Sequence, residues 1–493
     1  MRLDERKIQD IVEQVLGKLS NDPAVLAVIA RNATETATKS APPAAPTVVT
    51  SKVAADGKFG IFPDVDTAVA AARTAHERLV RDTSLDVRKK AIEAARRVTA
   101  DNAEQLAQMA VQETGLGRVE DKIGKNRCAA LKTPGMEAVF PSAHTGDHGL
   151  TLDERAPYGV IASITPCTNA TETIINNGIG MLAGGNGTVF NVHPTAKNTS
   201  VHFIRMLNQA MTAVGAPDNL FCCIAEPSIE SANGLMKHPD IRIVVVTGGP
   251  AVVKAAMQTG KKVIAAGPGN PPVVVDETAN IKNAARDIIR GASLDNNIVC
   301  IVEKEIFAVA AIADRLKDEM VRGGAYLLSE RQIQQLEQVI IEGGDHVNRR
   351  FIGKNANVIL REIGVQVGDD VRIAFGEVPE NHPFVQVEML MPVIPFVRVR
   401  DTDEAIAAAV RAEHKCYHTA VMHSTNIDNL DRMARAVNTS LFVKNGPSYA
   451  GLGLGGEGHT SWTIAGPTGE GLTTAYHFTR MRRCTLVDHF RIV

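Results

Sequence analysis

One cysteine, Cys300, lies in a segment that joins an apolar run to amide and charged side chains. The segment is Ser293-Leu294-Asp295-Asn296-Asn297-Ile298-Val299-Cys300-Ile301-Val302-Glu303-Lys304-Glu305. A cysteine thiolate attacks carbonyl carbons and can carry an acyl group as a thioester. A cysteine between apolar residues is also commonly a small buried hydrophobe, which is what we expect of the other six cysteines in the chain. The segment alone leaves both roles open for Cys300.

A glycine turn offers a second kind of chemistry. Thr247-Gly248-Gly249 follows the apolar run 241–246 and precedes Pro250, a residue suited to the first position of a helix. Exposed N–H groups and the helix dipole at such a turn suit a pyrophosphate. Glycine turns between strands and helices are common, so the turn alone does not identify a cofactor.

The elements around these residues alternate between helix and strand from Gly57 onward. The pattern predicts helices at 65–80, 85–113, 194–215, 250–260, 281–292 and 401–413, and a capping box at Ser329 and Gln332 that opens another. It predicts strands at 159–164, 188–192, 241–246, 262–265, 272–275 and 418–422, with extended segments near 145–155 and 476–490. This alternation predicts an α/β protein with two domains built on mostly parallel sheets.

Two segments together resemble one enzyme family. The Cys300 segment and Ala266-Gly267-Pro268-Gly269-Asn270-Pro271-Pro272-Val273 are similar to those of the aldehyde dehydrogenases, and most similar to the CoA-acylating propionaldehyde and acetaldehyde dehydrogenases of bacterial microcompartments. The resemblance runs from about residue 57 to the end. It implies a Rossmann-like nucleotide-binding domain at 57–138 and 156–265 and an α/β catalytic domain at 266–474. It also implies a small β oligomerisation flap from 139–155 and 475–493, and hence a homodimer or homotetramer.

The resemblance assigns two catalytic residues. Cys300 matches the nucleophile, which adds to the aldehyde and becomes the acyl carrier. Asn169, in Ile164-Thr165-Pro166-Cys167-Thr168-Asn169, matches the amide that stabilises the oxyanion. Losing one such donor typically costs about 100- to 1000-fold in rate. An asparagine after a strand also commonly caps a turn, which is the alternative role for Asn169.

The resemblance also implies NAD as cofactor and CoA as co-substrate. Residues matching the family's cofactor contacts are Thr165, Pro166, Asn191, His193, Pro227, Thr247, Gly248, Gly249 and Glu388. Asn191 replaces the lysine that usually meets the adenosine ribose, which leaves the choice between NAD and NADP open. Glu388 matches the glutamate that holds the nicotinamide ribose; otherwise it is a solvated strand end. The run 451–456, rich in glycine, lacks the spacing of a dinucleotide fingerprint, and we interpret it as a loop near the substrate or CoA tunnel.

Ala265 lies where hydrolytic members of the family carry a general-base glutamate. Alanine cannot activate water, whereas CoA brings its own thiol. We therefore expect CoA-dependent oxidation of a short aliphatic aldehyde, with propanal preferred over ethanal. The enzymatic alternative is a dehydrogenase that releases free acid. The alternative from another class is a non-catalytic scaffold whose N-terminal helix is the working part.

Composition and the N-terminal sequence limit the partners and the cellular location that we expect for the chain. The formal charge of −2 gives no strong field for nucleic acid or an anionic membrane, and no apolar run reaches the roughly 20 residues that span a bilayer. We found no CxxC or HExxH motif, no metal site and no signal peptide, and we expect a reduced cytosol.

The first 20 residues predict an amphipathic helix. Ile8, Ile11, Val12, Val15, Leu16 and Leu19 form one apolar stripe, and residues 21–56, rich in Ala, Thr and Pro, predict a disordered linker. We interpret 1–20 as an encapsulation helix that docks on a microcompartment shell protein or a co-packaged enzyme and takes the chain into the lumen. The alternatives are a helix packed on its own domain and a membrane-surface helix, which the mixed charge of its polar face disfavours.

Overall fold

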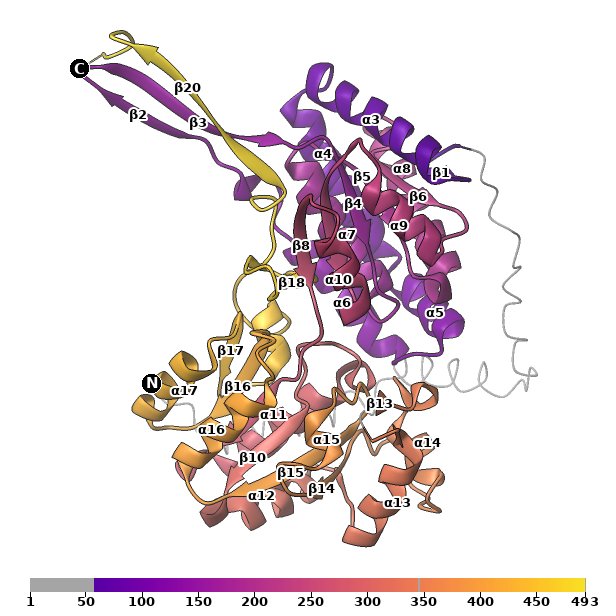
Figure 1. Ribbon diagram of the computed structural model, residues 1–493, viewed down its shortest axis with the longest axis vertical. Coiled ribbons are helices and arrows are strands. Elements are labelled where there is room, and N and C mark those ends of the chain that lie inside the picture. Colours follow the sequence, from indigo (N-terminus) through magenta and orange to yellow (C-terminus); the bar gives the residue numbers. More distant parts are fainter. Residues whose placement is uncertain (1–56, 345, 493) are drawn as a thin grey trace, which may run out of the picture. The chain divides into compact units, whose positions relative to one another are not determined.

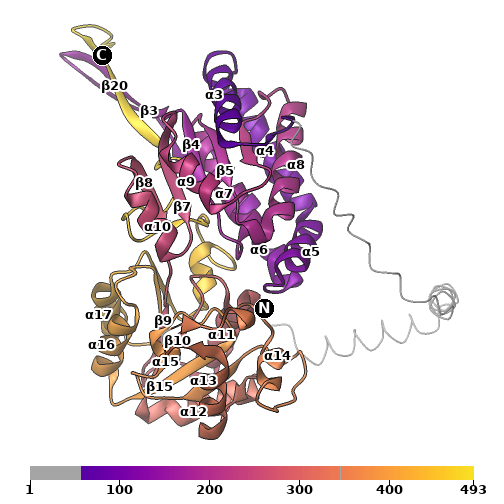
Figure 2. The ribbon, with the colours of Figure 1, turned by 45° about the vertical axis from the view of Figure 1, so that its right-hand side comes forward.

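The computed structural model describes residues 57–344 and 346–492 (Figure 1). The predicted helix at 1–20 and the predicted linker at 21–56 lie outside the described residues. The described part contains two large parallel sheets, a three-stranded antiparallel sheet and the helices that cover them (Figures 1 and 2).

The first large sheet has six parallel strands. Their order is β1 (Ile61–Phe62), β6 (Phe221–Ile224), β5 (Gly187–Asn191), β4 (Val160–Ile164), β7 (Ile241–Thr247) and β8 (Lys262–Ala266). Alternate residues face opposite layers: Ala162 and Val244 pack with α3 (Val65–Arg81), α9 (Ile229–Lys237) and α10 (Pro250–Met257). The opposite face packs against α4 (Leu85–Asp101), α7 (Ala170–Ala183) and α8 (Lys197–Ala213). With both faces covered, the strands are continuously apolar, as buried parallel strands are.

The second large sheet has seven parallel strands. Their order is β11 (Tyr326–Leu327), β14 (Ala374–Glu377), β15 (Val393–Val399), β10 (Glu305–Val309), β9 (Pro272–Val275), β16 (Thr419–His423) and β17 (Leu441–Lys444). One apolar core joins it to α11 (Ile281–Ser293), α12 (Ala310–Arg322), α13 (Glu330–Ile340), α16 (Thr402–Ala412) and α17 (Ile427–Val437). The boundary between the two predicted domains stays a prediction, but the strands of the two sheets come from the separate ranges 61–266 and 272–444.

Shorter elements connect these layers. The helices are α5 (Ala103–Thr114), α6 (Val119–Lys132), α14 (Ala356–Arg361), α15 (Pro383–Gln386), and the 3₁₀ turns η1 (Met136–Ala138), η2 (Pro194–Ala196), η3 (Leu294–Asn297), η4 (Arg349–Phe351) and η5 (Ser448–Leu452). The short strand pairs are β12 (Ile341–Glu342) with β13 (His346–Val347), and β18 (Ile464–Ala465) with β19 (Gly471–Leu472).

The antiparallel sheet is formed by β2 (Ser142–Gly146), β3 (Gly149–Pro157) and β20 (Thr479–Val487). The single extended segment predicted near 145–155 is wrong in detail, because the chain turns at 147–148 and makes a hairpin. Gly149 has φ +107°, and a Cβ there would lie 2.0 Å from the carbonyl oxygen of Leu486, so only glycine fits where β20 pairs with the turn. β2 is exposed along its whole length, and so is nearly all of β20.

Most predicted helices and strands are confirmed within a few residues, but the long helix at 85–113 is wrong. It is two helices, α4 and α5, broken at Asn102, whose backbone leaves helical geometry (φ −106°, ψ 16°). The Asn102 side chain donates to the carbonyl of Val98 at 2.7 Å, a local bond that competes with helix continuation. The capping box is confirmed: Ser329 and Gln332 exchange side-chain-to-backbone hydrogen bonds at the start of α13.

Candidate active site

The predicted nucleotide contacts follow the carboxyl ends of neighbouring strands in the first sheet. Thr165 and Pro166 follow β4, Asn191 and His193 end and follow β5, Pro227 follows β6, and 247–249 end β7. Because these strands are parallel, the residues share one edge of the sheet. The strand order reverses between β4 and β7, and the crevice at such a point is where open α/β sheets bind their ligands.

The start of α10 is open toward solvent. Gly249 is the exposed N-cap of this helix, and a Cβ built on it meets no described atom within 4 Å. The buried hydroxyl of Thr165 finds no hydrogen-bond partner in the described part of the chain. The N–H of Gly248 donates to the carbonyl of Ala266 at 3.1 Å. The first N–H groups of a helix suit a pyrophosphate, so this edge fits a dinucleotide. The hydroxyl of Thr247 already has a hydrogen-bond partner, the hydroxyl of Thr463 at 2.8 Å.

Asn191 and His193 already have side-chain partners. The Asn191 carbonyl accepts from the Ser231 hydroxyl at 2.6 Å. The His193 ring nitrogen Nδ1 lies 2.8 Å from the hydroxyl of Thr195 and accepts from its backbone N–H at 3.2 Å. Asn191 therefore supports the start of α9, whose N-cap is Ser228; its contact with a ribose stays a prediction.

The chain approaches Cys300 through three consecutive left-handed residues. Asp295, Asn296 and Asn297 have φ of +50°, +54° and +67°. For residues other than glycine this conformation costs about 1–2 kcal/mol each, and Asn and Asp tolerate it best. Each of the three side chains is fully buried and hydrogen-bonded, which holds the turn. The Asp-Asn-Asn part of the motif is thus explained by backbone geometry.

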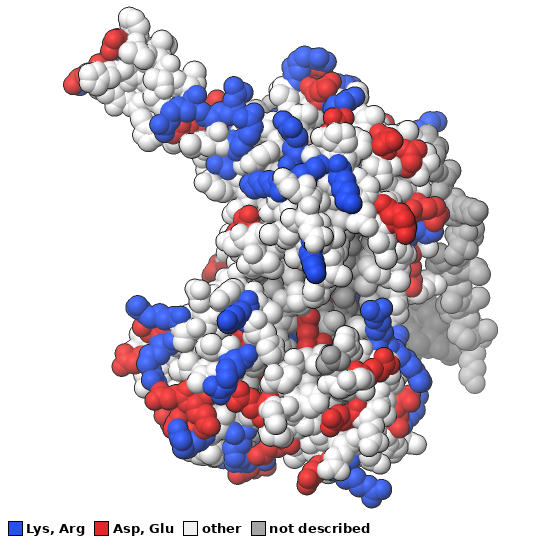
Figure 3. Space-filling model, in the orientation of Figure 1, with Lys and Arg blue, Asp and Glu red and all other residues white. Residues whose placement is uncertain are grey.

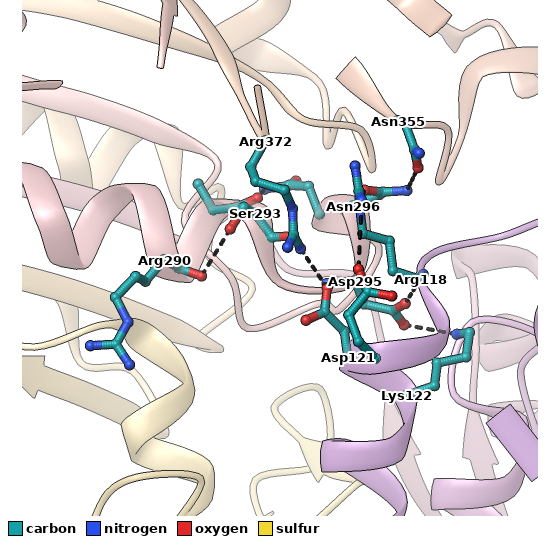
Figure 4. A network of polar contacts seen from close by, with 12 residues as sticks. Arg118, Asp121, Lys122, Arg290, Ser293, Asp295, Asn296, Asn355 and Arg372 are labelled. Atoms are coloured by element: carbon teal, nitrogen blue, oxygen red, sulfur yellow. Dashed lines mark hydrogen bonds and ion pairs between the residues drawn. The ribbon is translucent and has the colours of Figure 1, made fainter. Parts of the chain in front are cut away.

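Asp295 is the centre of a buried charge cluster (Figure 4). Its carboxylate accepts from Lys122 Nζ at 2.8 Å, from Lys125 Nζ at 2.6 Å and from the backbone N–H of Arg118 at 2.8 Å. Burial alone would raise the pKa of Asp295, but the two lysines of α6 hold it below its ordinary value. Glu172 lies 3.3 Å from Lys125 and completes two positive and two negative charges, all at most 3% exposed.

The same lysines reach the start of α7. Lys122 and Lys125 donate to the carbonyl of Thr168 at 3.1 and 3.4 Å, and Thr168 directly precedes Asn169. Asn169 is the N-cap of α7, is 5% exposed, and makes no side-chain capping bond. The capping role considered for Asn169 is therefore not realised. The cluster instead ties the turn before Cys300 to the residue before the predicted oxyanion amide.

Cys300 is half-buried and packs against the apolar core that includes Val299, Ile301 and Val302. A Cβ on Gly269 would lie 2.7 Å from the Cys300 carbonyl oxygen and 2.9 Å from the His418 ring, so glycine is required between them. Burial, together with Glu388, raises the pKa of the Cys300 thiol to about 12, against the positive charges of Lys304 and Lys125. The structure therefore brings Cys300 and Glu388 into one electrostatic site.

His418 and the lysines around Cys300 were not predicted from the sequence as site residues. His418 is 1% exposed, and its Nδ1 lies 2.9 Å from the Thr419 hydroxyl. Burial and Lys304 lower its pKa to about 4, so the ring beside the nucleophile is neutral. The only signal for His418 in the sequence was its place at the start of a buried strand; Lys122, Lys125 and Lys304 gave the pattern of ordinary surface lysines.

Ala265 lies in β8 beside Val246 of β7 and is fully buried. Its backbone N–H donates to the Thr468 hydroxyl at 3.0 Å. A methyl group at this position offers no proton acceptor, which agrees with the absence of a general base expected from the sequence.

A cavity of about 410 Å³ opens beside the turn that leads to Cys300. Its lining includes Asp121 and Gly124 of α6, Arg290 of α11, and Tyr449 and Leu454. The glycine-rich loop therefore borders this cavity through Leu454 and Gly455; its assignment to a substrate or CoA tunnel stays a prediction. A larger cavity of about 660 Å³ lies beside α4 and residues 135–141 and contains none of the predicted site residues.

On the surface, as in the buried cluster around Asp295, charged side chains of both signs are mixed. On the face in Figure 3, Lys and Arg side chains are interspersed with Asp and Glu. Within residues 57–344 and 346–492, no cluster of three or more His, Cys, Asp or Glu side chains is arranged to hold a metal ion. No helix of the described residues has the length and apolar character needed to cross a membrane.

Comparison with known proteins defines the class. The model of the aldehyde dehydrogenase family matches residues 32–462, and the chain belongs to this family. It is 51% identical, over 88% of its length and 94% of the relative's, to an acetylating acetaldehyde dehydrogenase of Salmonella typhimurium.

Two solved structures also resemble the chain. One is a propionaldehyde dehydrogenase of Rhodopseudomonas palustris with bound CoA and an acylated cysteine (TM-score 0.85, 49% identity, 87% of this chain and 98% of that one). The other is a propionaldehyde dehydrogenase from the fucose utilisation microcompartment of Clostridium phytofermentans (TM-score 0.86, 46% identity, 88% and 100%). Within the family, the chain thus falls among CoA-acylating enzymes of short aldehydes.

Proposed function

We propose that this protein oxidises a short aliphatic aldehyde to its acyl-CoA with reduction of NAD, and that Cys300 carries the acyl group. The observation that carries the proposal is the pairing of a nucleophile site, built around Cys300, with a buried alanine where a water-activating glutamate would stand. The acylated cysteine and bound CoA of the Rhodopseudomonas palustris relative support it.

The chain's own residues supply the acyl chemistry. The Cys300 sulfur adds to the aldehyde carbon, and its proton is lost, which gives a hemithioacetal with an oxyanion. The Asn169 side-chain amide and the backbone N–H of Cys300 donate to that oxyanion. Loss of a hydride then leaves a thioester, which the thiolate of CoA attacks to release acyl-CoA and regenerate the Cys300 thiolate.

NAD, when bound, accepts the hydride. We propose that it lies along the carboxyl edge of the first sheet, with its pyrophosphate at Gly248 and Gly249. Thr165, Pro166 and Pro227 would line the crevice, with Asn191 and His193 near the adenosine ribose. Glu388 would hold the nicotinamide ribose close to Cys300, in keeping with its electrostatic contact with that thiol. Asn191 carries no positive charge for a 2′-phosphate, which favours NAD over NADP.

Both two- and three-carbon aldehydes fit the proposal. The sequence expectation favours propanal, and the two solved relatives carry the name propionaldehyde dehydrogenase. The Salmonella typhimurium relative carries the name acetaldehyde dehydrogenase, so acetaldehyde is the second candidate. One methylene is worth only about 1–3 kcal/mol of discrimination, and kcat/KM for aldehydes of two to four carbons will rank them.

The test of the acyl carrier is Cys300→Ala. This variant should fold and bind NAD, but form neither NADH nor a labelled thioester. Cys167→Ala is the matched control, because Cys167 lies in the Asn169 segment and should be dispensable for acyl transfer. Substantial NADH production by Cys300→Ala, or equal thioester labelling of Cys167, would disprove the assignment.

The test of the acceptor is product analysis with and without CoA. Enzyme, aldehyde and NAD should give about one acylation event and then only slow turnover, whereas CoA should restore continuous turnover to acyl-CoA. Fast release of free acid without CoA would favour the hydrolytic alternative, and no NADH at all would favour the scaffold.

We also propose that residues 1–20 dock the enzyme inside a bacterial microcompartment. The support is the apolar stripe, which lies before the region matched by the family model, and the microcompartment origin of the Clostridium phytofermentans relative. Residues 1–20 fused to a fluorescent protein should enter compartments when the matching shell is made, and deleting them should leave activity nearly unchanged. A diffuse fusion, or an unfolded deletion variant, would contradict docking.

The β2–β3–β20 sheet is proposed as the oligomerisation flap of a homodimer or homotetramer. Its exposed strand β20 carries apolar side chains such as Met481 and Val487, which are 58% and 61% exposed. Charged residues in their place should shift the molecular mass measured by light scattering to that of the monomer.

A further inference from the structure

Lys304 is a buried lysine held beneath the turn that leads to the nucleophile. Only 1% of it is exposed. Its Nζ donates to the backbone carbonyl of Asn297 at 2.6 Å, to the side-chain carbonyl of Asn297 at 2.7 Å, and to the carbonyl of Val299 at 3.5 Å. All three acceptors belong to the residues directly before Cys300.

These acceptors are neutral oxygens. Lys122 and Lys125, in contrast, donate directly to the carboxylate of Asp295. Burying an ammonium group is costly unless it is paired or fully hydrogen-bonded, and a neutral amide would hold the Asn297 oxygens at lower cost. Holding the turn at 297–299 requires the hydrogen bonds of Lys304, but it does not require the positive charge of its side chain.

The charged groups around Lys304 come from several elements. Glu303 and Glu305 are its neighbours in the chain, and Glu388 comes from the loop before β15. All three carboxyl groups favour the charged ammonium, while burial lowers the pKa of Lys304. The neutral ring of His418 completes the surroundings, since Lys304 acts on it as well.

The charged groups that face Cys300 oppose one another. Glu388 disfavours a thiolate there, as burial does, whereas Lys304 and, more weakly, Lys125 of α6 favour it. Lys304 stands four residues from the nucleophile and touches its approach turn, while Lys125 is engaged with Asp295 and Glu172.

We propose that Lys304 is a positioning residue for Cys300: it clamps the turn at 297–299 and keeps beside the nucleophile a positive charge that stabilises its thiolate. This rests on the proposed role of Cys300 as acyl carrier. The charge of Lys304 is present before any ligand binds. It therefore stabilises the Cys300 thiolate, which burial and Glu388 destabilise.

The experiment measures alkylation of Cys300 by iodoacetamide across pH, with the labelled peptide identified by mass spectrometry. Lys304→Gln keeps N–H donors for the Asn297 oxygens and removes the charge; Lys304→Met removes both. At neutral pH, both variants should alkylate Cys300 about 10-fold or more slowly, since each unit of thiol pKa is tenfold in thiolate. Because the pKa of the Cys300 thiol is about 12, this deficit should have the same size at every pH well below that value.

Lys132→Met is the matched control. Lys132 also clamps a loop through carbonyls, those of Gly453 and Gly456 at 2.6 and 2.9 Å, so its loss disturbs a loop without removing the charge beside Cys300. Its alkylation profile should follow that of the unmodified protein. If Lys304→Met does not fold, Lys304→Gln decides the question alone.

Unchanged alkylation in Lys304→Gln, with a deficit only in Lys304→Met, would show that Lys304 acts only as a clamp and would overturn the proposal. The proposed function fails separately: its failure would be continued NADH formation after Cys300 is fully alkylated, in the unmodified protein.

Discussion

Two buried polar clusters lie on either side of Cys300 in the sequence, and their charged side chains have different kinds of partner. Before it, Asp295 and Glu172 contact Lys122 and Lys125 directly, so that opposite charges meet. After it, the side chains of Glu303 and Lys304 bond to neutral partners, Ser448 and the Asn297 turn. Both Glu305 carboxyl oxygens are buried and have no hydrogen-bond partner within the described residues.

This difference gives the two clusters different roles. A paired and neutral cluster fixes distances, here between the nucleophile turn, α6 and the start of α7, and gives little net field. Charges bonded to neutral groups leave a field that acts on whatever titrates nearby, which in this site is Cys300. Substitutions in the paired cluster should therefore change stability by the same amount at all pH values near neutrality, whereas the effect of replacing Glu303 should depend on pH.

The largest effect is expected from Asp295→Asn. The change leaves two buried ammonium groups without their carboxylate, which typically costs about 3–5 kcal/mol. Denaturant unfolding at neutral pH measures it. Asp86→Asn is the control, since Asp86 pairs with Lys90 on the surface (70% and 61% exposed) and should change stability much less than Asp295→Asn. Equal losses in the two variants would abolish the distinction between the clusters.

A smaller, pH-dependent effect is expected from Glu303→Gln. Burial raises the pKa of Glu303 to about 7 from its ordinary 4.5, despite the two bonds from Ser448. A raised carboxyl pKa stabilises the fold fully below pH 4.5, and this contribution is lost as pH rises through 7. Glutamine has no such dependence.

The stability of Glu303→Gln relative to the unmodified protein should therefore increase by about 3 kcal/mol between pH 4.5 and 8. Unfolding midpoints measured at both pH values check it. A difference that stays constant with pH would mean that Glu303 remains ionised in the fold, which would place it with the paired cluster.

The smallest effect is expected from Glu305→Met. Burial raises the pKa of Glu305 well above its ordinary value, and its carboxyl oxygens have no hydrogen-bond partner within the described residues. Replacing it with an apolar side chain of similar length should change stability by about 1 kcal/mol or less, or increase it. A loss as large as that of Asp295→Asn would reveal a hydrogen-bond partner of Glu305, such as an ordered water.

The sequence predicted the layers of the fold well where one face of an element is apolar. The stripe on α11 and the β-branched run of β7 gave bounds close to those observed. It failed at Asn102, where a side chain ends a helix by bonding to its own backbone, and in the β2–β3 hairpin, whose exposed strands have no apolar face to mark them.

In the site, the resemblance predicted roles for Cys300 and Glu388, because both lie in segments similar to those of the family. It gave no role to Lys304, which lies in the same segment as Cys300, or to Lys122 and Lys125. Lysine is almost never fully buried unless paired, so nothing in the local sequence distinguishes a lysine that faces solvent from one beneath a nucleophile. Lys122 and Lys125 lie more than 160 residues from their partner Asp295 in the sequence. The partner of Lys304 is Asn297.

The left-handed run at 295–297 also limits how the enzyme can change in evolution or in the laboratory. Three adjacent positions accept few side chains, because the backbone excludes β-branched residues and each amide or carboxylate is already bonded inside the protein. New substrate ranges must therefore arise around this turn. Arg290, Tyr449 and Leu454, which line the neighbouring cavity, have ordinary backbone geometry. The backbone does not restrict substitutions at these cavity positions, whereas most substitutions at 295–297 should destabilise the fold.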